Sequence, residues 1–296
     1  MDCIDCMRTF VSTVRAGGFA SVARTLDIPR SKVSKQIQAL EAMLGVQLLL
    51  RTTRSLHLTE AGARYHAAAL EVLAALDAAE DEARGSSAAL QGVLRLNVPV
   101  SFGVRVLAPL LPRFHALHPD VALQLCLTDQ LVDPVRGGFD ASIRIAQLPD
   151  SSLVARQLML APRRLVAAPA LLRRVGMPAT PKALAAVPVL NYGNQQGGTT
   201  MAFTRAGVTE RVHLRGPLVA DNGDLLCVAA VAGMGIALLP DFITADPIGA
   251  GLLQPVLTDW QPPAIAVHAL LPPGRKPPRR TQAFVDFLLQ ALRGPR

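Results

Sequence analysis

Apolar residues recur every three or four positions through the first 44 residues, which is the period of an α-helix. This spacing predicts one helix that ends at Gly17, a short helix over 20–26 and a third helix over 30–44. In the third helix the expected buried stripe is Val33, Ile37, Leu40 and Leu44. Two short apolar runs, 46–50 and 56–58, enclose a polar stretch and predict a small hairpin, or wing.

A long uninterrupted helix is predicted over 59–84, because this stretch has no proline and its one glycine, Gly62, lies near the start. Thr59 is suited to cap this helix. Its apolar residues are spaced 4, 3, 4 and 3 apart, as in a coiled-coil seam: Tyr65, Ala69, Val72, Leu76 and Ala79. We expect the helix, roughly 35–40 Å long, to pair two copies of the chain. The alternative is that it packs on its own domain.

From residue 92 onward, stretches in which apolar and polar residues alternate are followed by stretches in which apolar residues recur at helical spacing, and this order repeats. Strands are predicted over 93–98, 121–127 and 143–145, a helix over 104–114, and a second such set from about 164. This alternation is typical of an α/β fold with a mainly parallel sheet and helices on its faces. The predicted organisation is a head (1–58), a helix with a flexible hinge (59–91) and an α/β body (92–296).

Charge is distributed unevenly along the chain. The 30 Lys and Arg exceed the 22 Asp and Glu, which gives a net charge of +8. Residues 1–58 carry +4, the helix over 59–84 carries −4 and the body carries +8. A basic head and body favour an acidic partner, nucleic acid before a membrane surface. Aromatic residues make up only 4%, which disfavours the stacking surfaces of single-strand binders.

The first ten residues hold two aspartates and no apolar core, which argues against a secretory signal peptide. No uninterrupted apolar run reaches the ~18 residues of a membrane span. We therefore expect a cytoplasmic protein whose four cysteines are free thiols. Cys3 and Cys6 form a lone C-x-x-C pair, and His115 and His118 have no third ligand nearby, so no metal or cofactor is expected.

A basic, small-polar face lies opposite the apolar stripe of the helix over 30–44. Its residues are Arg30, Ser31, Lys32, Ser34, Lys35 and Gln38, and the wing adds Arg51, Thr52 and Arg54. Two helices joined by a tight turn, the second with such a face, suit the major groove of duplex DNA. Hydroxyl and amide groups can reach base edges, and the cations can reach phosphates. An ordinary solvated helix face is the alternative.

Short motifs in the first 62 residues carry a resemblance to a known family: Ala23-Arg24-Thr25-Leu26, Val33-Ser34-Lys35-Gln36-Ile37, Arg51-Thr52-Thr53-Arg54 and Leu58-Thr59-Glu60-Ala61-Gly62. On these motifs the head resembles the winged helix-turn-helix of LysR-type transcriptional regulators. The resemblance implies that 30–44 is the recognition helix, that 51–54 lies near the minor groove, and that the next helix pairs two heads on an inverted repeat. The chain departs at Ala20, Lys32 and Lys35, where the family often has Ser or Thr, Ala, and Arg respectively.

Weaker motifs in the body follow the order of the same family, at 92–96, 139–145, 153–158 and 233–240. The body thus resembles the family's effector-binding domain, a two-lobed fold like that of periplasmic binding proteins. By this resemblance, lobe I comprises about 92–161 and 265–296, and lobe II about 162–264. The resemblance further implies a sequence-specific regulator, controlled by a small molecule between the lobes, that forms a homodimer or homotetramer. RNA polymerase is a further candidate partner.

Candidate effector-binding residues follow from where strands end, since ligands of such sheets bind beyond the carboxyl ends of the strands. The candidates are Ser101 and Phe102 in a strand-to-helix joint, Thr128 with Asp129, Arg144, and Asn222 at a helix start. The first amides of the joint and Arg144 would suit an anionic group on the effector. The alternatives are plain helix capping by Ser101 and Asn222, and an internal ion pair at Arg144.

Signature motifs of several enzyme classes are missing from the sequence. It holds no G-x-x-x-x-G-K-S/T, no G-x-G-x-x-G after a strand, no H-E-x-x-H and no G-x-S-x-G. We therefore predict that the protein is not an enzyme. An enzyme in the body and a solute-binding protein are the alternatives, and the second conflicts with the lack of an export signal.

Overall fold

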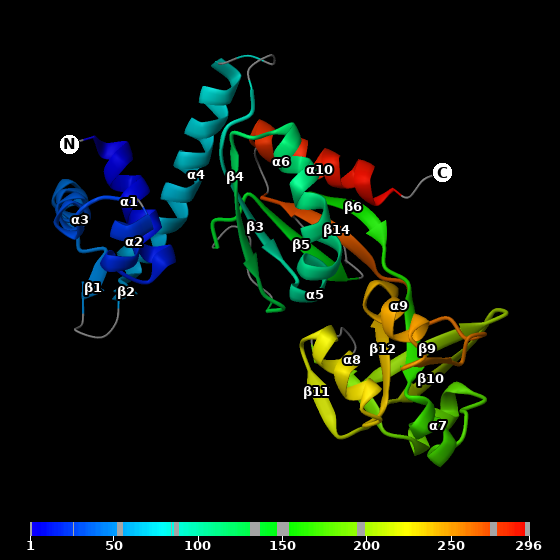
Figure 1. Cartoon of the computed structure of the whole chain (residues 1–296). Coiled ribbons are helices and arrows are strands. Elements are labelled where there is room, and N and C mark those ends of the chain that lie inside the picture. Colours follow the sequence, from blue (N-terminus) through cyan, green and yellow to red (C-terminus); the bar gives the residue numbers. More distant parts are fainter. Residues whose placement is uncertain are drawn as a thin grey trace. The chain divides into compact units, whose positions relative to one another are not determined.

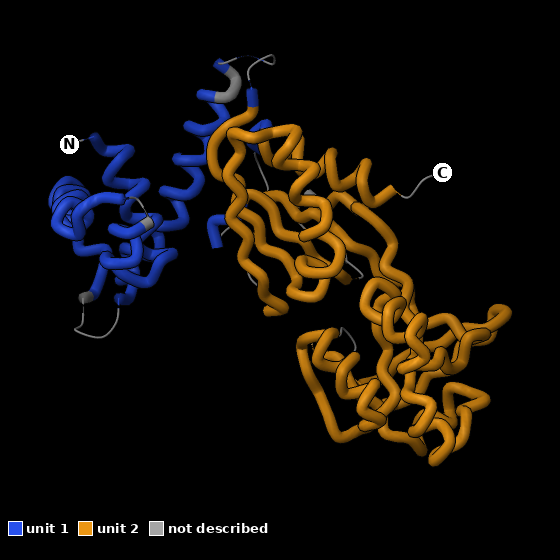
Figure 2. The backbone as a smooth tube through the Cα atoms, in the orientation of Figure 1, with its two compact units in different colours: residues 1–89, 132–139, 274–279 blue, residues 90–131, 140–273, 280–296 orange. Residues whose placement is uncertain are grey.

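The computed structural model of the chain describes residues 2–25, 27–51, 56–83, 85, 89–130, 137–146, 154–193, 199–272 and 277–293. The chain divides into two compact units (Figure 2). The head unit comprises residues 1–89 with 132–139 and 274–279, and the body unit comprises 90–131, 140–273 and 280–296. Each unit has its own hydrophobic core.

The head unit begins with three helices and a hairpin and continues into a long helix (Figure 1). In chain order these are α1 (Cys3–Ala16), α2 (Phe19–Thr25), α3 (Arg30–Leu44), β1 (Leu49–Arg51), β2 (Leu56–Leu58) and α4 (Glu60–Ala83). Asp2 caps α1 by accepting a hydrogen bond from Ile4 N at 3.0 Å. Gly17 and Gly45 end α1 and α3 in the left-handed conformation, with φ of 66° and 67°. The predicted winged helix-turn-helix is confirmed.

One hydrophobic core joins α1, α3, the hairpin and the start of α4. Its fully or nearly buried members are Cys6, Phe10, Val11, Ile37, Leu40, Leu48, Leu49, Ala69 and Leu70. The expected stripe of α3 is buried at Val33, Ile37 and Leu40, but Leu44 is 38% exposed. The expectation for Leu44 was wrong, because the last turn of α3 extends past this core before Gly45 ends the helix.

The start of α4 is fixed tightly against the segment before the hairpin. Thr59 caps the helix as expected, since its Oγ1 accepts a hydrogen bond from Gly62 N at 2.8 Å. The Thr59 hydroxyl also lies 2.8 Å from Gln47 O, to which it donates. A Cβ atom added at Gly62 would overlap the backbone carbonyl of Leu48. Glycine is therefore needed at this position for α4 to approach the core so closely.

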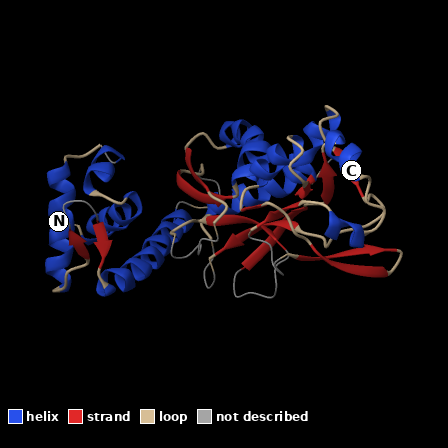
Figure 3. Cartoon of the chain, turned by 90° about the horizontal axis from the view of Figure 1, so that it is seen from below, coloured by secondary structure: helices blue, strands red, loops and turns tan. Residues whose placement is uncertain are grey.

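Lobe I of the body unit is built on a five-stranded sheet in the order β4-β3-β5-β14-β6. Its strands are β3 (Gly92–Val98), β4 (Val121–Leu127), β5 (Ala141–Ala146), β6 (Val154–Leu160) and β14 (Ala266–Leu271). Its helical segments are α5 (Val100–Phe102), a π-helical turn (Gly103–Leu107), a 3-10 turn (Ala108–Leu110), α6 (Leu111–Leu117) and α10 (Arg279–Leu292). Phe114 contacts both Phe284 and Phe287, so α6 and α10 pack against each other, and Figure 3 shows helices of the body unit lying over its strands.

Lobe II holds a second five-stranded sheet in the order β11-β8-β12-β7-β13, with β9 and β10 paired as a separate hairpin. Its strands are β7 (Arg163–Ala167), β8 (Val189–Tyr192), β9 (Thr200–Arg205), β10 (Val208–His213), β11 (Leu218–Ala220), β12 (Ile236–Pro240) and β13 (Gln254–Val256). Its helices are α7 (Pro169–Val175), a 3-10 turn (Pro181–Ala186), α8 (Gly223–Val231) and α9 (Asp241–Gly249). The two-lobed α/β architecture is therefore confirmed.

Both sheets are mixed, whereas the sequence pattern predicted mainly parallel sheets. β3 runs parallel to β4 and β5, but β14 runs antiparallel to β5 and β6. In lobe II, β8 runs parallel to β11 and β12, but β7 runs antiparallel to β12 and β13. The chain crosses between the lobes from β6 into β7 and returns into β14. A helix that connects two strands of the same sheet favours parallel pairing of those strands. The crossings between the lobes contain no such helix, so antiparallel pairing is possible at these strands.

The two crossings are hydrogen-bonded to each other. Ala161 N donates to Ile265 O at 2.9 Å, and Arg163 Nη2 donates to Pro263 O at 2.8 Å. Burial lowers the pKa of Arg163 to about 10, so this side chain is still cationic at neutral pH.

None of the helices that the structure describes has the length and apolar character of a membrane span.

Candidate functional site

A basic face on α3 points away from the core of the head unit. The residues predicted for this face are exposed, apart from Ser34, which is half-buried beside them: Arg30, Ser31, Lys32, Lys35 and Gln38. The buried stripe of α3 lies on the opposite side and packs into the head core. The sequence pattern therefore located an outward surface with three cations and three uncharged polar groups.

Polar contacts add to the apolar packing that positions α3. Gln36 is buried, and its Oε1 accepts a hydrogen bond from Thr9 Oγ1 of α1 at 3.0 Å. Glu41 Oε1 accepts hydrogen bonds from the backbone amides of Leu48 and Leu49 at 2.8 and 3.1 Å. These contacts fix the middle and the C-terminal part of the helix. A face carried by such a rigid element loses little conformational entropy when it binds.

The first turn of α3 is electropositive. It contains no acidic residue, and its N-cap residue, Pro29, makes no side-chain hydrogen bond to the helix. The helix dipole places a partial positive charge at this end, to which Arg30 and Lys32 add two full charges. This end of α3 is therefore suited to bind phosphate groups.

The wing is described in part. Its strands pair antiparallel, with Leu49 opposite Leu58 and Arg51 opposite Leu56. The side chain of Arg51 and the residues Thr52 and Arg54 lie outside the described residues, so their predicted contacts with DNA stay predictions.

The predicted seam of α4 is divided between the head core and solvent. Ala69 is buried in the core, and Tyr65 packs against Phe10 with ring centroids 5.6 Å apart. Leu76 is half-buried, whereas Val72 is 51% exposed and Ala79 is exposed. The first part of α4 is thus held by its own head, as one of the two alternatives anticipated.

A different stripe of small and apolar residues faces solvent on α4. Its members are spaced 4, 3 and 4 apart: Ala68, Val72, Ala75 and Ala79. This is again the spacing of a coiled-coil seam: Val72 and Ala79 belong to the predicted seam, whereas Ala68 and Ala75 take the place of Ala69 and Leu76. The ion pair from Arg8 Nη2 to Asp77 Oδ1, at 2.9 Å, lies on another side of α4. This stripe exposes small and apolar side chains along the described part of α4.

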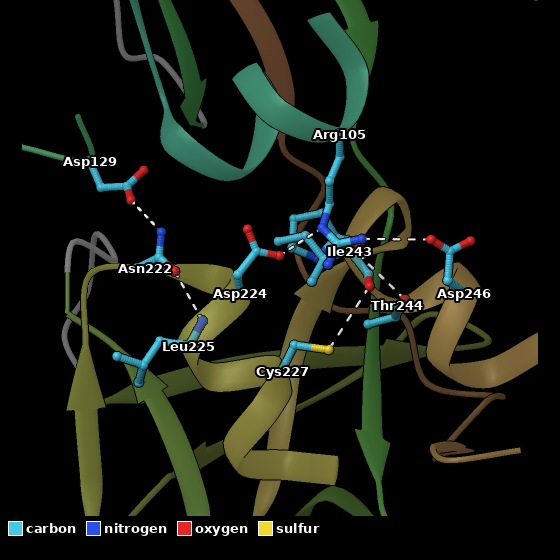
Figure 4. Close-up of polar contacts among 10 residues, drawn as sticks. Arg105, Asp129, Asn222, Asp224, Leu225, Cys227, Ile243, Thr244 and Asp246 are labelled. Carbon is cyan, nitrogen blue, oxygen red and sulfur yellow. Dashed lines mark hydrogen bonds and ion pairs between the residues drawn. The ribbon is translucent and has the colours of Figure 1, made fainter. Parts of the chain in front are cut away.

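A hydrogen bond joins the two lobes at the start of α8 (Figure 4). Asn222 caps α8, because its Oδ1 accepts from Leu225 N at 2.9 Å, and its Nδ2 donates to Asp129 Oδ2 at 2.7 Å. The other carboxylate oxygen of Asp129 accepts from Val100 N at 3.1 Å. Asn222 therefore acts as the expected cap and also as a link from lobe II to lobe I.

Arg105 makes a second polar contact between the lobes. It lies in the π-helical turn, a feature that is frequent at functional sites. Its Nε donates to Asp224 Oδ1 of α8 at 2.6 Å, and its Nη1 lies 3.7 Å from Asp246 Oδ2 of α9 (Figure 4). The ring of Phe102 meets Phe242 edge-on, with centroids 5.9 Å apart. Phe102 is fully buried, so its contacts here are with the protein itself.

Arg144 lies in β5 close to these contacts and is only 8% exposed. Its Nη1 donates to the backbone oxygen of Gln130 at 3.2 Å. Burial lowers the pKa of Arg144, and the negative charge of the Asp129 carboxylate, followed by that of Tyr192 when its hydroxyl is ionised, opposes that shift. Thr128 turns the chain here, since its Oγ1 accepts from Gln130 N at 3.2 Å. Arg144 and Asp129 are thus electrostatic neighbours.

Three buried polar atoms near this point have no hydrogen-bond partner among the described residues. They are Asn97 Oδ1, Ser101 Oγ and Ser142 Oγ. Asn97 and Ser142 lie opposite each other on the paired strands β3 and β5, and Ser101 follows β3 directly. Buried polar groups usually have partners, so a bound molecule or water would satisfy them. We call the set Asn97, Ser101, Asp129, Ser142, Arg144 and Asn222 the interlobe junction.

The sequence pattern missed Asn97, Ser142 and Arg105. Asn97 was detectable as a polar residue inside an apolar strand. Ser142 becomes informative only once β5 is known to pair with β3, and Arg105 only once the lobes are in contact. Among the described residues, no group of three or more His, Cys, Asp or Glu could hold a metal ion. Cys227 is buried, and burial raises the pKa of its thiol.

Two family models together match most of the chain. Residues 4–63 match the model described as "Bacterial regulatory helix-turn-helix protein, lysR family". Residues 87–293 match the model described as "LysR substrate binding domain". The first match covers the surface formed by α3, and the second covers the interlobe junction.

Similar proteins and structures span nearly the whole chain. An HTH-type transcriptional regulator of Xanthomonas campestris is 34% identical over 287 residues, 96% of this chain and 83% of the relative. The structure of CrgA, a LysR-type transcriptional regulator from Neisseria meningitidis, is similar with a TM-score of 0.63 and 30% identity, covering 98% of this chain and 99% of that one. The Vibrio cholerae virulence activator AphB gives a TM-score of 0.62 and 27% identity, covering 98% and 99%.

Proposed function

This chain belongs to the LysR family of transcriptional regulators, and from that premise we propose how it reads DNA, pairs and responds to a small molecule. It is a DNA-binding transcriptional regulator with a substrate-binding regulatory domain, and it is not an enzyme. We propose that α3 enters the major groove of an inverted-repeat operator while the wing contacts the backbone beside the minor groove. The protein would act in the cytoplasm, with RNA polymerase as a further candidate partner.

The exposed basic face of α3 is the observation that carries the DNA-binding proposal. Ser31, Ser34 and Gln38 offer hydroxyl and amide groups that can distinguish base edges. Lys32 and Lys35 are flexible point charges, so they would contact phosphates or guanine edges alike. On this division, the cations contribute mainly to the affinity for DNA, and the uncharged groups contribute mainly to the sequence preference.

Salt dependence of DNA binding tests this division. Lys35→Ala should weaken binding to all duplexes and reduce the slope of log affinity against log salt by about 0.9 for each phosphate that the protein no longer neutralises. Fluorescence anisotropy with a labelled duplex, titrated at several salt concentrations, measures both quantities. The control is Lys182→Ala, which removes an exposed lysine from lobe II. A slope that stays the same for Lys35→Ala and for Arg54→Ala would contradict the proposal.

We propose that α4 pairs two chains through its exposed stripe, with Val72 at the centre. The stripe is too narrow and too rich in alanine to be a large interface by itself, which suits a paired linker between two head units. Exposed apolar residues on lobe II, among them Val219, Leu225 and Val228, support further self-association of the body. Sedimentation analysis distinguishes a homodimer from a homotetramer.

We propose that the interlobe junction binds the small-molecule effector. Three buried polar atoms that have no partner among the described residues favour a small polar molecule, and the buried arginine favours one that carries an anionic group. Binding there would change the contacts between the lobes and, through them, the spacing of the paired heads. Genome-wide mapping of bound DNA with and without candidate metabolites would identify operator and effector together. Maps that no metabolite alters would contradict the proposed control.

A further inference from the structure

Two polar contacts between the lobes meet at the beginning of α8. Asn222, the cap of this helix, bonds to Asp129 of lobe I at 2.7 Å, and Asp224 in its first turn bonds to Arg105 of lobe I at 2.6 Å. Figure 4 shows both links reaching α8 from the same side. A third contact, the Phe102–Phe242 pair, adds an apolar element beside them.

Both side chains of the Asn222–Asp129 bond are already fixed within their own lobes. The Oδ1 atom of Asn222 accepts from Leu225 N, and the Oδ1 atom of Asp129 accepts from Val100 N. Each residue therefore reaches across with its second polar atom, in a position set by the first. Such preorganisation means that the bond forms with little further loss of side-chain entropy.

Asp129 also places a negative charge where an anionic effector would be held. Its carboxylate faces the amide of Val100, the amide group of Asn222 and the electrostatic field of Arg144. These are the groups that would bind a carboxylate from solution. A carboxylate of the protein itself therefore occupies the position that such an effector would take.

We propose that Asp129 and Asn222 form a latch that holds the two lobes together in the effector-free protein. The inference deepens the proposed function, since it rests on the interlobe junction being the effector site. An effector that reaches the amide of Asn222 has to break this bond, and the loss of the Asn222–Asp129 link between the start of α8 and lobe I is then the structural change that binding produces. Arg105 and Asp224 keep a second, more exposed contact when the latch opens.

An exchange of donor and acceptor tests the latch. Asp129→Asn keeps the size of the side chain and its bond from Val100 N, but it turns an NH2 group toward the NH2 group of Asn222. Asn222→Asp keeps the cap of α8, but it sets two carboxylates against each other. Each single variant should open the lobes. The double variant, Asp129→Asn with Asn222→Asp, should close them again, because donor and acceptor are restored in reversed order.

The distance between the lobes is measured by electron paramagnetic resonance on the full chain, without DNA or small molecule. One label replaces exposed Asp120 of lobe I and the other replaces exposed Arg173 of lobe II, after the exposed Cys3 and Cys126 are changed to serine. Labelled chain is diluted with unlabelled chain so that distances arise within one copy. Asp221→Asn, which removes an exposed charge beside Asn222, is the matched control and should leave the distance unchanged.

Longer or broader distances in both single variants, and recovery in the double variant, are the expected result. Distances that match the wild type in both single variants would overturn the latch, as would a double variant that stays open. DNA affinity of the same variants separates the latch from the function on which it rests. If the lobe distances follow the expected pattern while DNA affinity does not change, the latch stands and the proposed effector control fails.

Discussion

The basic face of α3 and the interlobe junction are both polar surfaces, but they are built in opposite ways. On α3 the polar side chains point into solvent from a rigid helix, so their partner has to come from outside the chain. At the junction Asn97, Ser101, Ser142 and Arg144 are buried, and the half-buried Asn222 and Asp129 bond to each other across the lobes. On the proposed function, the first surface is ready to bind as it stands, whereas the second would exchange internal contacts for external ones.

The largest expected effect is a loss of the α3 surface, while the interlobe junction is unchanged. Gly62→Ala would drive a methyl group into the backbone carbonyl of Leu48 and displace α4 from the head core. We expect the head unit to lose about 1–3 kcal/mol of stability, or more, because backbone cannot give way as a flexible side chain does. Urea unfolding followed by circular dichroism should show an earlier transition, and DNA binding should be lost with it.

Gly18→Ala is the control for this variant, since a Cβ atom there meets nothing within 4 Å. It should unfold like the wild type. If Gly62→Ala also unfolds like the wild type, the tight approach of α4 to Leu48 is contradicted, and with it the rigid support of α3.

The next effect tests whether the α3 surface needs a second copy of the chain. Val72→Glu places a carboxylate in the middle of the exposed stripe of α4, where pairing would have to desolvate it. We expect the dissociation constant of the pair to rise at least about tenfold, which is ~1.4 kcal/mol, and sedimentation equilibrium measures it. Ala63→Glu changes an exposed residue away from the stripe and should have no such effect. Equal dissociation constants for both variants would remove Val72 from the interface.

A smaller effect is the pH dependence of the stability of the head unit. His66 is buried against Phe10, and burial, aided by the positive charge of Arg15, lowers its pKa below the ordinary value of 6.5. The unfolded chain therefore binds a proton that the folded head does not, and the stability of the head should fall as the pH drops through about 6.5 toward the folded pKa. Thermal unfolding at a series of pH values measures this loss.

His66→Leu should remove that part of the pH dependence, whereas replacement of the exposed His57 should retain it. A loss at low pH that is the same in wild type and His66→Leu would show that another group titrates. Such a result would contradict the burial of His66 in the head core.

The smallest effect is expected at an interlobe contact that is partly open to water. The side chains of Arg105 and Asp224 are each 31% exposed, so solvent weakens their attraction. A double-mutant cycle with Arg105→Gln and Asp224→Asn should give a coupling free energy below about 1 kcal/mol. A coupling of several kcal/mol would make this pair, and not Asn222–Asp129, the main link between the lobes.

The two surfaces also differ in how far the sequence could predict them. The outward face of α3 depends only on helical spacing within 15 residues, so Lys35 and Gln38 could be placed on it from the sequence alone. The junction depends on residues from β3, β4, β5 and α8, which are far apart in the chain. Capping by Asn222 is a local property and was predictable, but its bond to Asp129, 93 positions away, was not.

Two failures of prediction have specific physical causes. The seam of α4 was assigned from spacing alone, and spacing cannot tell which of two neighbouring stripes the head core takes; the core took Ala69 and left Val72 exposed. The sheets were expected to be mainly parallel because strands and helical stretches alternate. At the crossings between the lobes, where β6 leads directly into β7, the sequence contains no pattern that predicts the direction of the strands.

The central claim, that the outward face of α3 reads duplex DNA as half of a symmetric pair, is tested most directly by selection of bound duplexes from a random library. The wild-type protein should enrich an inverted repeat, and Gln38→Ala should relax the base preference at two symmetry-related positions while the rest of the repeat is retained. Selection that enriches no sequence, or a repeat that is identical for Gln38→Ala, Ser34→Ala and the wild type, would contradict it.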